Sequence, residues 1–122
     1  MTTPRLAVMA FVLLEACSAT DVTQSPWEPS PTGGWLTRTV RTDTSGPGNN
    51  YLAETIQVRN VAADKPVDIL TLEEMNGPAT IKLGWRDPTH LEVAYTNGKV
   101  VFQVVKVGDL RIDAIPMAGV ME

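Results

Sequence analysis

The side chains that most often carry chemistry are sparse in this chain. Of its 122 residues, His90 is the only histidine and Cys17 is the only cysteine. A zinc site usually takes about four ligands, mostly histidine and cysteine, and a serine triad needs a histidine base beside an activated nucleophile. No nucleophile-elbow motif is present. We therefore expect no metal, no cofactor and no nucleophilic catalysis, and we interpret His90 as a turn or surface residue.

Carboxylates are the remaining candidates for catalysis. Glu73, Glu74, Asp87 and Glu92 lie at the ends of predicted strands. Glycosidases need two carboxyl groups roughly 5–9 Å apart beside a cleft, and a small β-domain offers little room for one. We expect that the protein is not an enzyme.

The overall charge argues against nucleic acid as a partner. Lys and Arg number 10 against 14 Asp and Glu, which gives a formal net charge of −4. Nucleic-acid binding depends on clustered basic side chains that neutralise phosphates, and the chain shows no such cluster.

Residues 80–115 give the clearest secondary-structure signal. Runs rich in β-branched and aromatic residues alternate with turn sequences, and the runs are residues 80–85, 90–95, 100–107 and 110–115. This pattern predicts an antiparallel meander. The third run is apolar on both faces, which predicts a central strand.

Three turns join these runs. Asn97-Gly98 predicts a type I′ hairpin between the second and third runs, because both residues tolerate positive φ. Residues 86–89 predict a type I turn in which Asp87 caps backbone amides, and Gly108-Asp109 predicts the last hairpin.

The earlier part of the chain adds further strands. Alternating patterns predict strands at residues 35–42, 53–60 and 67–72, with a long flexible loop at residues 44–50. About seven strands make a single all-β domain over residues 35–116, either a curled antiparallel sheet or a small sandwich. Residues 117–122 are a C-terminal tail.

Aromatic and arginine side chains leave two interpretations open. Trp35, Tyr51, Trp85 and Tyr95 are expected in the core, and an aromatic binding platform is the alternative. The arginines at positions 38, 41 and 59 suit a solvated sheet face with cross-strand acidic partners.

The N-terminal segment is typical of a secretory signal. Residues 1–16 carry Arg5, an apolar run and small residues, and the run is shorter than the roughly 20 residues of a membrane-spanning helix. Residues 14–17, Leu-Glu-Ala-Cys, resemble the bacterial lipobox, which implies lipidation of Cys17. An ordinary signal-peptidase site is the alternative.

The residues after Cys17 are expected to place the domain relative to a membrane. Residues 17–34 are rich in Pro, Ser, Thr and Gly, which predicts a mobile tether with Trp27 as its one large apolar side chain. Ser18 resembles the outer-membrane sorting signal of Gram-negative lipoproteins. We expect an outer-membrane lipoprotein facing the periplasm, or otherwise a soluble secreted or periplasmic protein.

Three stretches carry a resemblance to a known group of domains. Residues 30–35 (SPTGGW), 43–46 (DTSG) and 84–95 (GWRDPTHLEVAY) resemble small bacterial secreted or lipoprotein β-domains. In that group an S-P-D-G-K-W entry and a W-x-D-x-x-x-L-x-I-x-Y hairpin recur, and this chain departs from the entry at Thr32 and Gly34. The resemblance implies an envelope location and a β architecture, and it brings no established activity.

These observations favour a binding module over a catalyst. We expect an envelope lipoprotein that binds another protein, for example as an immunity protein, an inhibitor or an accessory subunit. A passive structural lipoprotein is the alternative. Loops on a rigid sheet often carry recognition, so the expected partner-binding residues are Asp43, Asn49, Asn50 and Tyr51.

Overall fold

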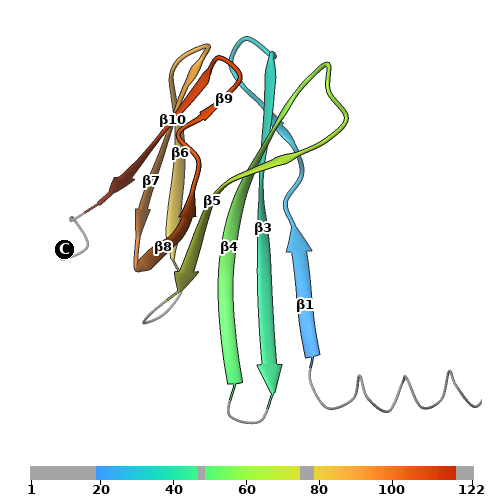
Figure 1. Cartoon of the computed structure of the whole chain (residues 1–122), viewed down its shortest axis with the longest axis vertical. Helices are drawn as coiled ribbons and strands as arrows, with labels where there is room; N and C mark the ends of the chain where they lie inside the picture. Colours follow the sequence, from blue (N-terminus) through green and yellow to red (C-terminus); the bar gives the residue numbers. More distant parts are fainter. Residues whose placement is uncertain (1–18, 47–48, 75–78, 118–122) are drawn as a thin grey trace, which may run out of the picture.

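The chain forms two facing β-sheets (Figure 1). The structure is a computed structural model that describes residues 19–46, 49–74 and 79–117. The predicted signal peptide and Cys17 lie outside the described residues. Within these ranges no helix is long and apolar enough to cross a membrane. The predicted all-β fold is confirmed, and it takes the form of a small sandwich rather than one curled sheet.

The larger sheet contains most of the N-terminal half of the domain. Its strands are β1 (Ala19–Gln24), β2 (Glu28–Pro29), β3 (Trp35–Gly46), β4 (Asn49–Asn60), β5 (Val67–Glu74) and β8 (Gly98–Gln103). They run in the order β1-β3-β4-β5-β8, and β2 pairs with the first residues of β3. All neighbours in this sheet are antiparallel. The strand order places β1 and β8 at its two edges.

The smaller sheet covers one face of the larger one. Its order is β6-β7-β10-β9, built from β6 (Thr80–Asp87), β7 (His90–Thr96), β10 (Leu110–Pro116) and β9 (Lys106–Val107). β6 and β7 form an antiparallel hairpin, whereas β7 and β10 are parallel. The predicted continuous meander is therefore wrong, because the chain leaves this sheet after β7 and returns at β9, although the first and the last of its hairpins are present.

One core joins the two sheets. Alternate residues of β7 and β10 are buried, and they pack against side chains from β3, β4 and β5; the buried set is Trp35, Ile56, Val58, Ile69, Leu70, Leu72, Leu91, Val93, Leu110 and Ile112. Burial of each large apolar side chain contributes about 1.5–3 kcal/mol. Trp85 and Tyr95 pack on this core, while Tyr51 is 38% exposed, so the predicted core role holds for all of the four aromatics except Tyr51.

Two of the predicted turns are confirmed. The Asp87 carboxylate accepts hydrogen bonds from the Thr89 amide at 2.9 Å and from the Thr89 hydroxyl. Gly108 has a φ of +57°, and the residues on either side of Gly108-Asp109 pair as Val107 and Leu110. A positive φ at this position is what glycine provides without strain.

The predicted type I′ hairpin at Asn97-Gly98 is wrong. Asn97 has a φ of 59°, but Gly98 is not among the residues with positive φ, and a type I′ turn needs both. β7 ends at Thr96 in the smaller sheet, and β8 begins at Gly98 in the larger sheet. The left-handed residue Asn97 therefore turns the chain from one sheet to the other.

The run at residues 100–107 is not a central strand. It divides into β8, at one edge of the larger sheet, and β9, at one edge of the smaller sheet. At the crossing, the Val104 amide donates to the Ile69 carbonyl, and the Ile112 amide donates to the Val105 carbonyl. The apolar residues of this run therefore belong to edge strands of two different sheets, and several of them are exposed.

Residues 19–34, predicted as a mobile tether, belong to the domain. β1 pairs with β3 from Ala19 opposite Ser45 to Gln24 opposite Val40. The Arg38 guanidinium carbon lies 4.3 Å from the centroid of the Trp27 ring, which is close enough for cation–π attraction. Composition alone misses such a segment, because strand pairing satisfies its backbone while its side chains remain polar and exposed.

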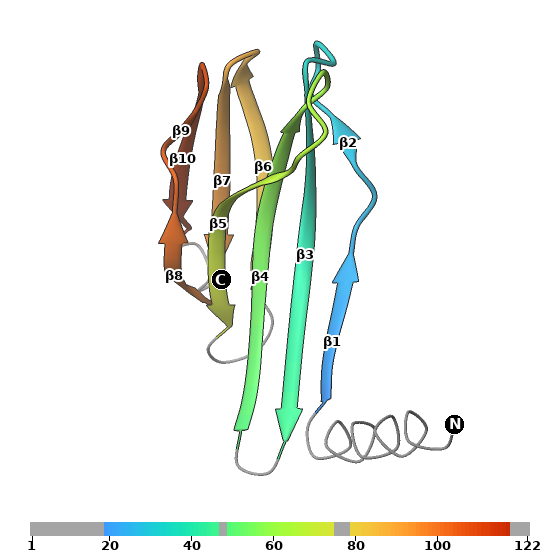
Figure 2. The same cartoon turned by 45° about the vertical axis from the view of Figure 1, so that its right-hand side comes forward.

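The predicted flexible loop at residues 44–50 is the end of a long hairpin. β3 and β4 stay paired as far as Gly46 opposite Asn49. The hairpin extends past the end of the smaller sheet (Figure 2). Gly46, Asn49 and Asn50, which suggested a loop, instead belong to the paired strands, and residues 47–48 lie outside the described residues.

Candidate functional site

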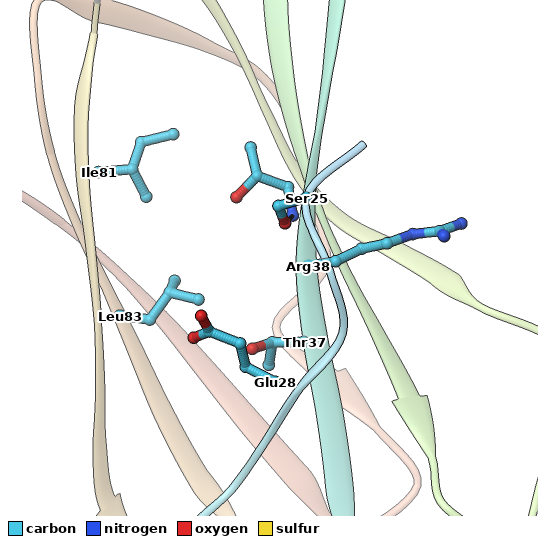
Figure 3. A pocket seen from close by; sticks show the side chains of 7 residues that line it. Ser25, Glu28, Thr37, Arg38, Ile81 and Leu83 are labelled. Carbon is cyan, nitrogen blue, oxygen red and sulfur yellow. Dashed lines mark hydrogen bonds between the residues drawn. The ribbon is translucent and has the colours of Figure 1, made fainter. Parts of the chain in front are cut away.

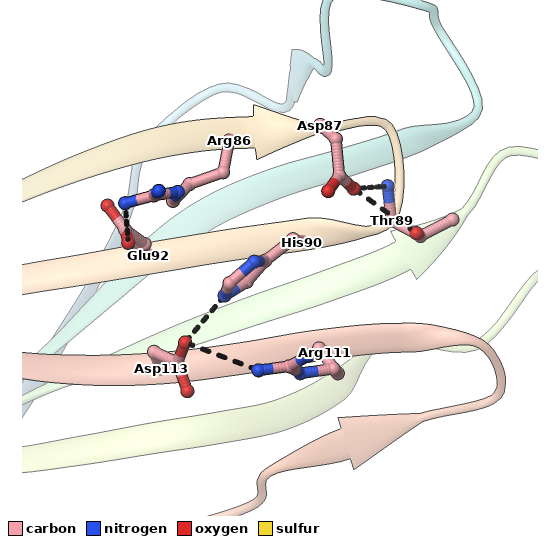
Figure 4. A network of polar contacts seen from close by, with 7 residues as sticks. All are labelled: Arg86, Asp87, Thr89, His90, Glu92, Arg111 and Asp113. Atoms are coloured by element: carbon pink, nitrogen blue, oxygen red, sulfur yellow. Dashed lines mark hydrogen bonds and ion pairs between the residues drawn. The ribbon is translucent and has the colours of Figure 1, made fainter.

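A histidine and two carboxylates gather on the outer face of the smaller sheet (Figure 4). His90 and Glu92 alternate along β7 with the buried residues Leu91 and Val93. Parallel pairing places Asp113 of β10 beside Glu92. The His90 Nε2 donates a hydrogen bond to the Asp113 Oδ2, and the candidate ligand atoms of the three residues lie within 4.8 Å of one another. We call His90, Glu92 and Asp113 the ligand cluster.

His90 is less exposed than the sequence suggested. It begins strand β7, and its side chain is 17% exposed. His90 therefore lies on the sheet surface rather than in the turn, and its side chain is partly buried there. Strand pairing fixes the backbone of His90 at the start of β7, and its imidazole contacts Asp113 on the neighbouring strand β10.

Two arginines border the ligand cluster. The Arg86 Nη1 lies 3.1 Å from the Glu92 Oε2, and the Arg111 Nη2 lies 4.0 Å from the Asp113 Oδ2. Both arginine side chains are more than half exposed. Exposed ion pairs of this kind contribute about 0–1 kcal/mol, so the strands rather than the arginines hold the cluster together.

An acidic pair lies at the end of the core on the larger sheet. The Arg41 Nη1 is 2.9 Å from the Glu54 Oε2 and 3.4 Å from the Glu74 Oε2. The Glu74 side chain is 2% exposed, and its Oε1 is buried without a hydrogen-bond partner among the residues that the structure describes. The expected cross-strand pairing is confirmed for Arg41.

These two carboxyl groups have pKa values shifted in opposite directions. Burial, together with the hydrogen bond and the negative charge of Glu74, raises the pKa of Glu54 to about 7 against the opposing effect of Arg41. Burial also acts to raise the pKa of Glu74, but Glu54, the Ala79 amide and Arg41 together lower it. The pair therefore holds one proton, mainly on Glu54, up to about neutral pH.

A cleft of about 320 Å³ opens between β6 and the segment that joins β1 to β2 (Figure 3). Its lining includes Ser25, Glu28, Thr37, Thr39, Ile81 and Leu83. Ile81 and Leu83 form an apolar wall opposite the Glu28 carboxylate, while the Arg38 side chain points away from the space. The volume is near the lower limit of about 300–1,000 Å³ for ligand pockets.

The free edge of β8 carries an exposed apolar patch. Val101 is 45% exposed, Phe102 46% and Val105 65%. The register between β5 and β8 shifts at Leu72 opposite Val100 and Thr71 opposite Phe102, so Val101 is an extra residue in a β-bulge. Lys99 and Lys106, both exposed, flank these residues along the chain. We call Val101, Phe102 and Val105 the β8 patch.

The expected partner-binding residues lie away from this patch. Asp43 and Tyr51 are exposed on the extended hairpin, in β3 and β4, and Asn49 and Asn50 are the first residues of β4. All of them belong to paired strands rather than to a flexible loop. The structure thus brings them to one end of the larger sheet, beside the start of β1.

The fold and these surfaces define a small β-sandwich with one apolar edge. No protein-family model matches the chain, and neither a curated protein nor a solved structure matches it.

Sequence reasoning missed the ligand cluster and misread the β8 patch. The ligand cluster was missed because Asp113 reaches His90 only through parallel pairing of β7 with β10, and a meander has no such pair. The β8 patch was visible as a run of apolar residues on both faces, which is typical of a central strand as well as of an unprotected edge.

Proposed function

We propose that the protein is a non-catalytic binding module of the bacterial envelope, and that its β8 patch contacts another protein. The observation that carries this proposal is the exposure of Val101 and Phe102 in the edge strand β8 and of Val105 just after it. Single exposed apolar residues are common on protein surfaces. A cluster on a sheet edge is a typical interaction site, since edges are normally protected by charge or by short length.

The charges around the patch favour a particular kind of partner. Lys99 and Lys106 flank it in a chain whose formal net charge is −4. An apolar surface or segment with acidic groups at its rim complements this arrangement, because charge at an interface rim steers association. A second copy of the chain would present lysines instead, since a symmetric contact uses the same surface twice.

A lipid anchor at the N-terminus is compatible with a partner bound at the β8 patch. We infer that Cys17 is lipidated, and Ala19, two residues later, begins β1 opposite Ser45 near the hairpin end. Extended residues span about 3.3–3.6 Å each. A lipid on Cys17 would therefore hold this end of the larger sheet close to the membrane, without the tether that the sequence suggested. β8 lies at the other edge of that sheet, where a partner is not in competition with lipid.

Site-specific photo-crosslinking tests the proposal. A photoreactive phenylalanine analogue placed at Phe102 of the full chain in cells should give an adduct with a different protein. Val22 on β1 is 57% exposed and is the matched control at the opposite edge. Placement at Tyr51 tests the hairpin as the contact site. Adducts at Val22 or Tyr51 but not at Phe102 would overturn the β8 assignment, and an adduct with the mass of two copies would indicate self-association.

A further inference from the structure

We propose that His90, Glu92 and Asp113 bind a divalent transition-metal ion such as Zn²⁺ on the outer face of the smaller sheet. The sequence alone argued against a metal site, because the chain has a single histidine and a single cysteine. The fold changes that argument by adding two carboxylates to the histidine from adjacent strand positions. One imidazole and two carboxylates are a donor set that zinc and related ions accept.

The placement of these donors is favourable for coordination. His90 and Glu92 lie on the central strand β7, where pairing with β6 and β10 fixes their backbone positions on both sides, and Asp113 is fixed by its pairing with β7. Donors on regular strands hold their geometry better than donors on loops. The candidate ligand atoms already lie within 4.8 Å of one another, which leaves only side-chain rotations to bring them around one ion.

A metal ion would replace the Arg86–Glu92 ion pair and the His90–Asp113 hydrogen bond. The Arg86 side chain is 63% exposed and can move into solvent when Glu92 turns to an ion. Losing that ion pair costs little, because the pair is exposed to solvent. The hydrogen on the His90 Nε2, now donated to Asp113, would leave that atom, and the imidazole would coordinate in its Nδ1–H form.

Three protein donors leave part of the coordination shell open. The remaining positions would be filled by water or by a donor from another molecule, because zinc sites with three protein ligands keep a fourth position open. His90 and Glu92 come from β7 and Asp113 comes from β10, so the ion would link the two strands whose parallel pairing depends on the crossover through β8. Metal binding should therefore stabilise the folded domain.

Zinc titration of the full chain tests the site. The chain should carry Cys17→Ala as its background, because a free thiol binds zinc independently. Calorimetry gives the affinity, and NMR of the single imidazole reports coordination at His90 without ambiguity. We expect saturable binding with one ion per chain, a shift of the His90 ring signals and a rise in Tm with Zn²⁺ concentration.

Variants separate a real site from general charge attraction. His90→Ala and Asp113→Asn should each lower the Zn²⁺ affinity by about tenfold or more. Asp109→Asn is the matched control, because it removes one carboxylate of the same chain at an exposed turn outside the cluster. Arg86→Ala should raise the affinity by about two- to fivefold, since it removes a competing positive charge.

Several results would overturn the site. These are unchanged Zn²⁺ affinity in His90→Ala, an equal loss in Asp109→Asn and Asp113→Asn, or weaker binding in Arg86→Ala. Equal affinity for Ca²⁺, which prefers oxygen ligands alone, would overturn the choice of a transition metal. Circular dichroism of each variant shows that the fold is retained. None of these readouts depends on the partner proposed for the β8 patch.

Discussion

A side chain at Gly98 would make an unusually tight contact with Leu72. An ideal Cβ on Gly98 lies 3.2 Å from the Leu72 Cβ and 3.3 Å from its Cδ2, and Leu72 is fully buried in the core. Close packing against β5 thus favours glycine at the start of β8. Glycine is not required by a positive φ, which the neighbouring Asn97 adopts instead.

Replacing Gly98 should therefore destabilise the fold through overpacking. We expect Gly98→Val to lower the free energy of unfolding by about 1–3 kcal/mol, because Leu72 and its neighbours must shift. Gly84→Val on β6 is the control, since no atom lies within 4 Å of a Cβ there and valine favours strands. Urea denaturation measures both. Equal stability of the Gly98 variant and the parent would contradict the packing argument.

The acidic pair should make stability depend on pH near neutrality. The folded-state pKa of Glu54 is about 7, above its ordinary value of 4.5, so the folded state binds more protons between these values. The contribution of Glu54 to the free energy of unfolding is therefore fully present below about pH 4.5 and is lost as the pH rises through about 7. The pKa of Glu74 is lowered, so its contribution to the free energy of unfolding is lost only when the pH falls below the ordinary pKa of a glutamate, 4.5.

We accordingly expect the Tm of the parent protein to fall between about pH 5 and pH 8. Glu54→Gln imitates the protonated form and should flatten this slope. Glu73→Gln, next to Glu74 in β5, is the control and should keep the parent slope. The measurement is thermal unfolding across this range by circular dichroism. A parent Tm that stays constant or rises with pH would show that Glu54 is not protonated in the folded state.

Much of the strand content was predictable because it depends on local pattern. The predicted strands are present except the one at residues 100–107, which divides into β8 and β9. Alternation of apolar and polar residues, as in Leu91 and Val93 against His90 and Glu92, reflects burial of one sheet face. The Asp87 and Gly108 turns were also predictable, because side-chain capping and positive φ are properties of a few adjacent residues.

Pairing between distant strands was not predictable from the same patterns. Asn97-Gly98 suits a hairpin locally, but β8 pairs with β5 in the other sheet, where Gly98 lies close to Leu72. That crossover makes β7 and β10 parallel neighbours, and only then do His90 and Asp113 meet. β1 was missed for a related reason, because its partner β3 supplies the stabilisation that its own polar residues do not.

The proposed anchor makes a prediction about location. Cys17→Ala should move the protein from the membrane fraction to the soluble fraction, because two or more acyl chains are needed for stable anchoring. Mass spectrometry of the parent should show acyl chains on the N-terminal peptide. Ser18→Ala is the control for a neighbouring change and should keep the protein in the membrane fraction. Unchanged partition of the Cys17 variant, or a parent mass without lipid, would contradict the anchor.

The proposed use of the β8 patch is tested most directly by hydrogen exchange on the complex with the crosslinked partner. We predict that amides in residues 98–106 become protected when the partner binds, because the partner covers the edge strand β8, with Val101 and Phe102, and the following residue Val105. Val101→Asp should abolish both the protection and the binding, while Val22→Asp on the opposite edge should leave them unchanged. Protection confined to β1 or to the end of the β3–β4 hairpin, with residues 98–106 unaffected, would contradict the proposal.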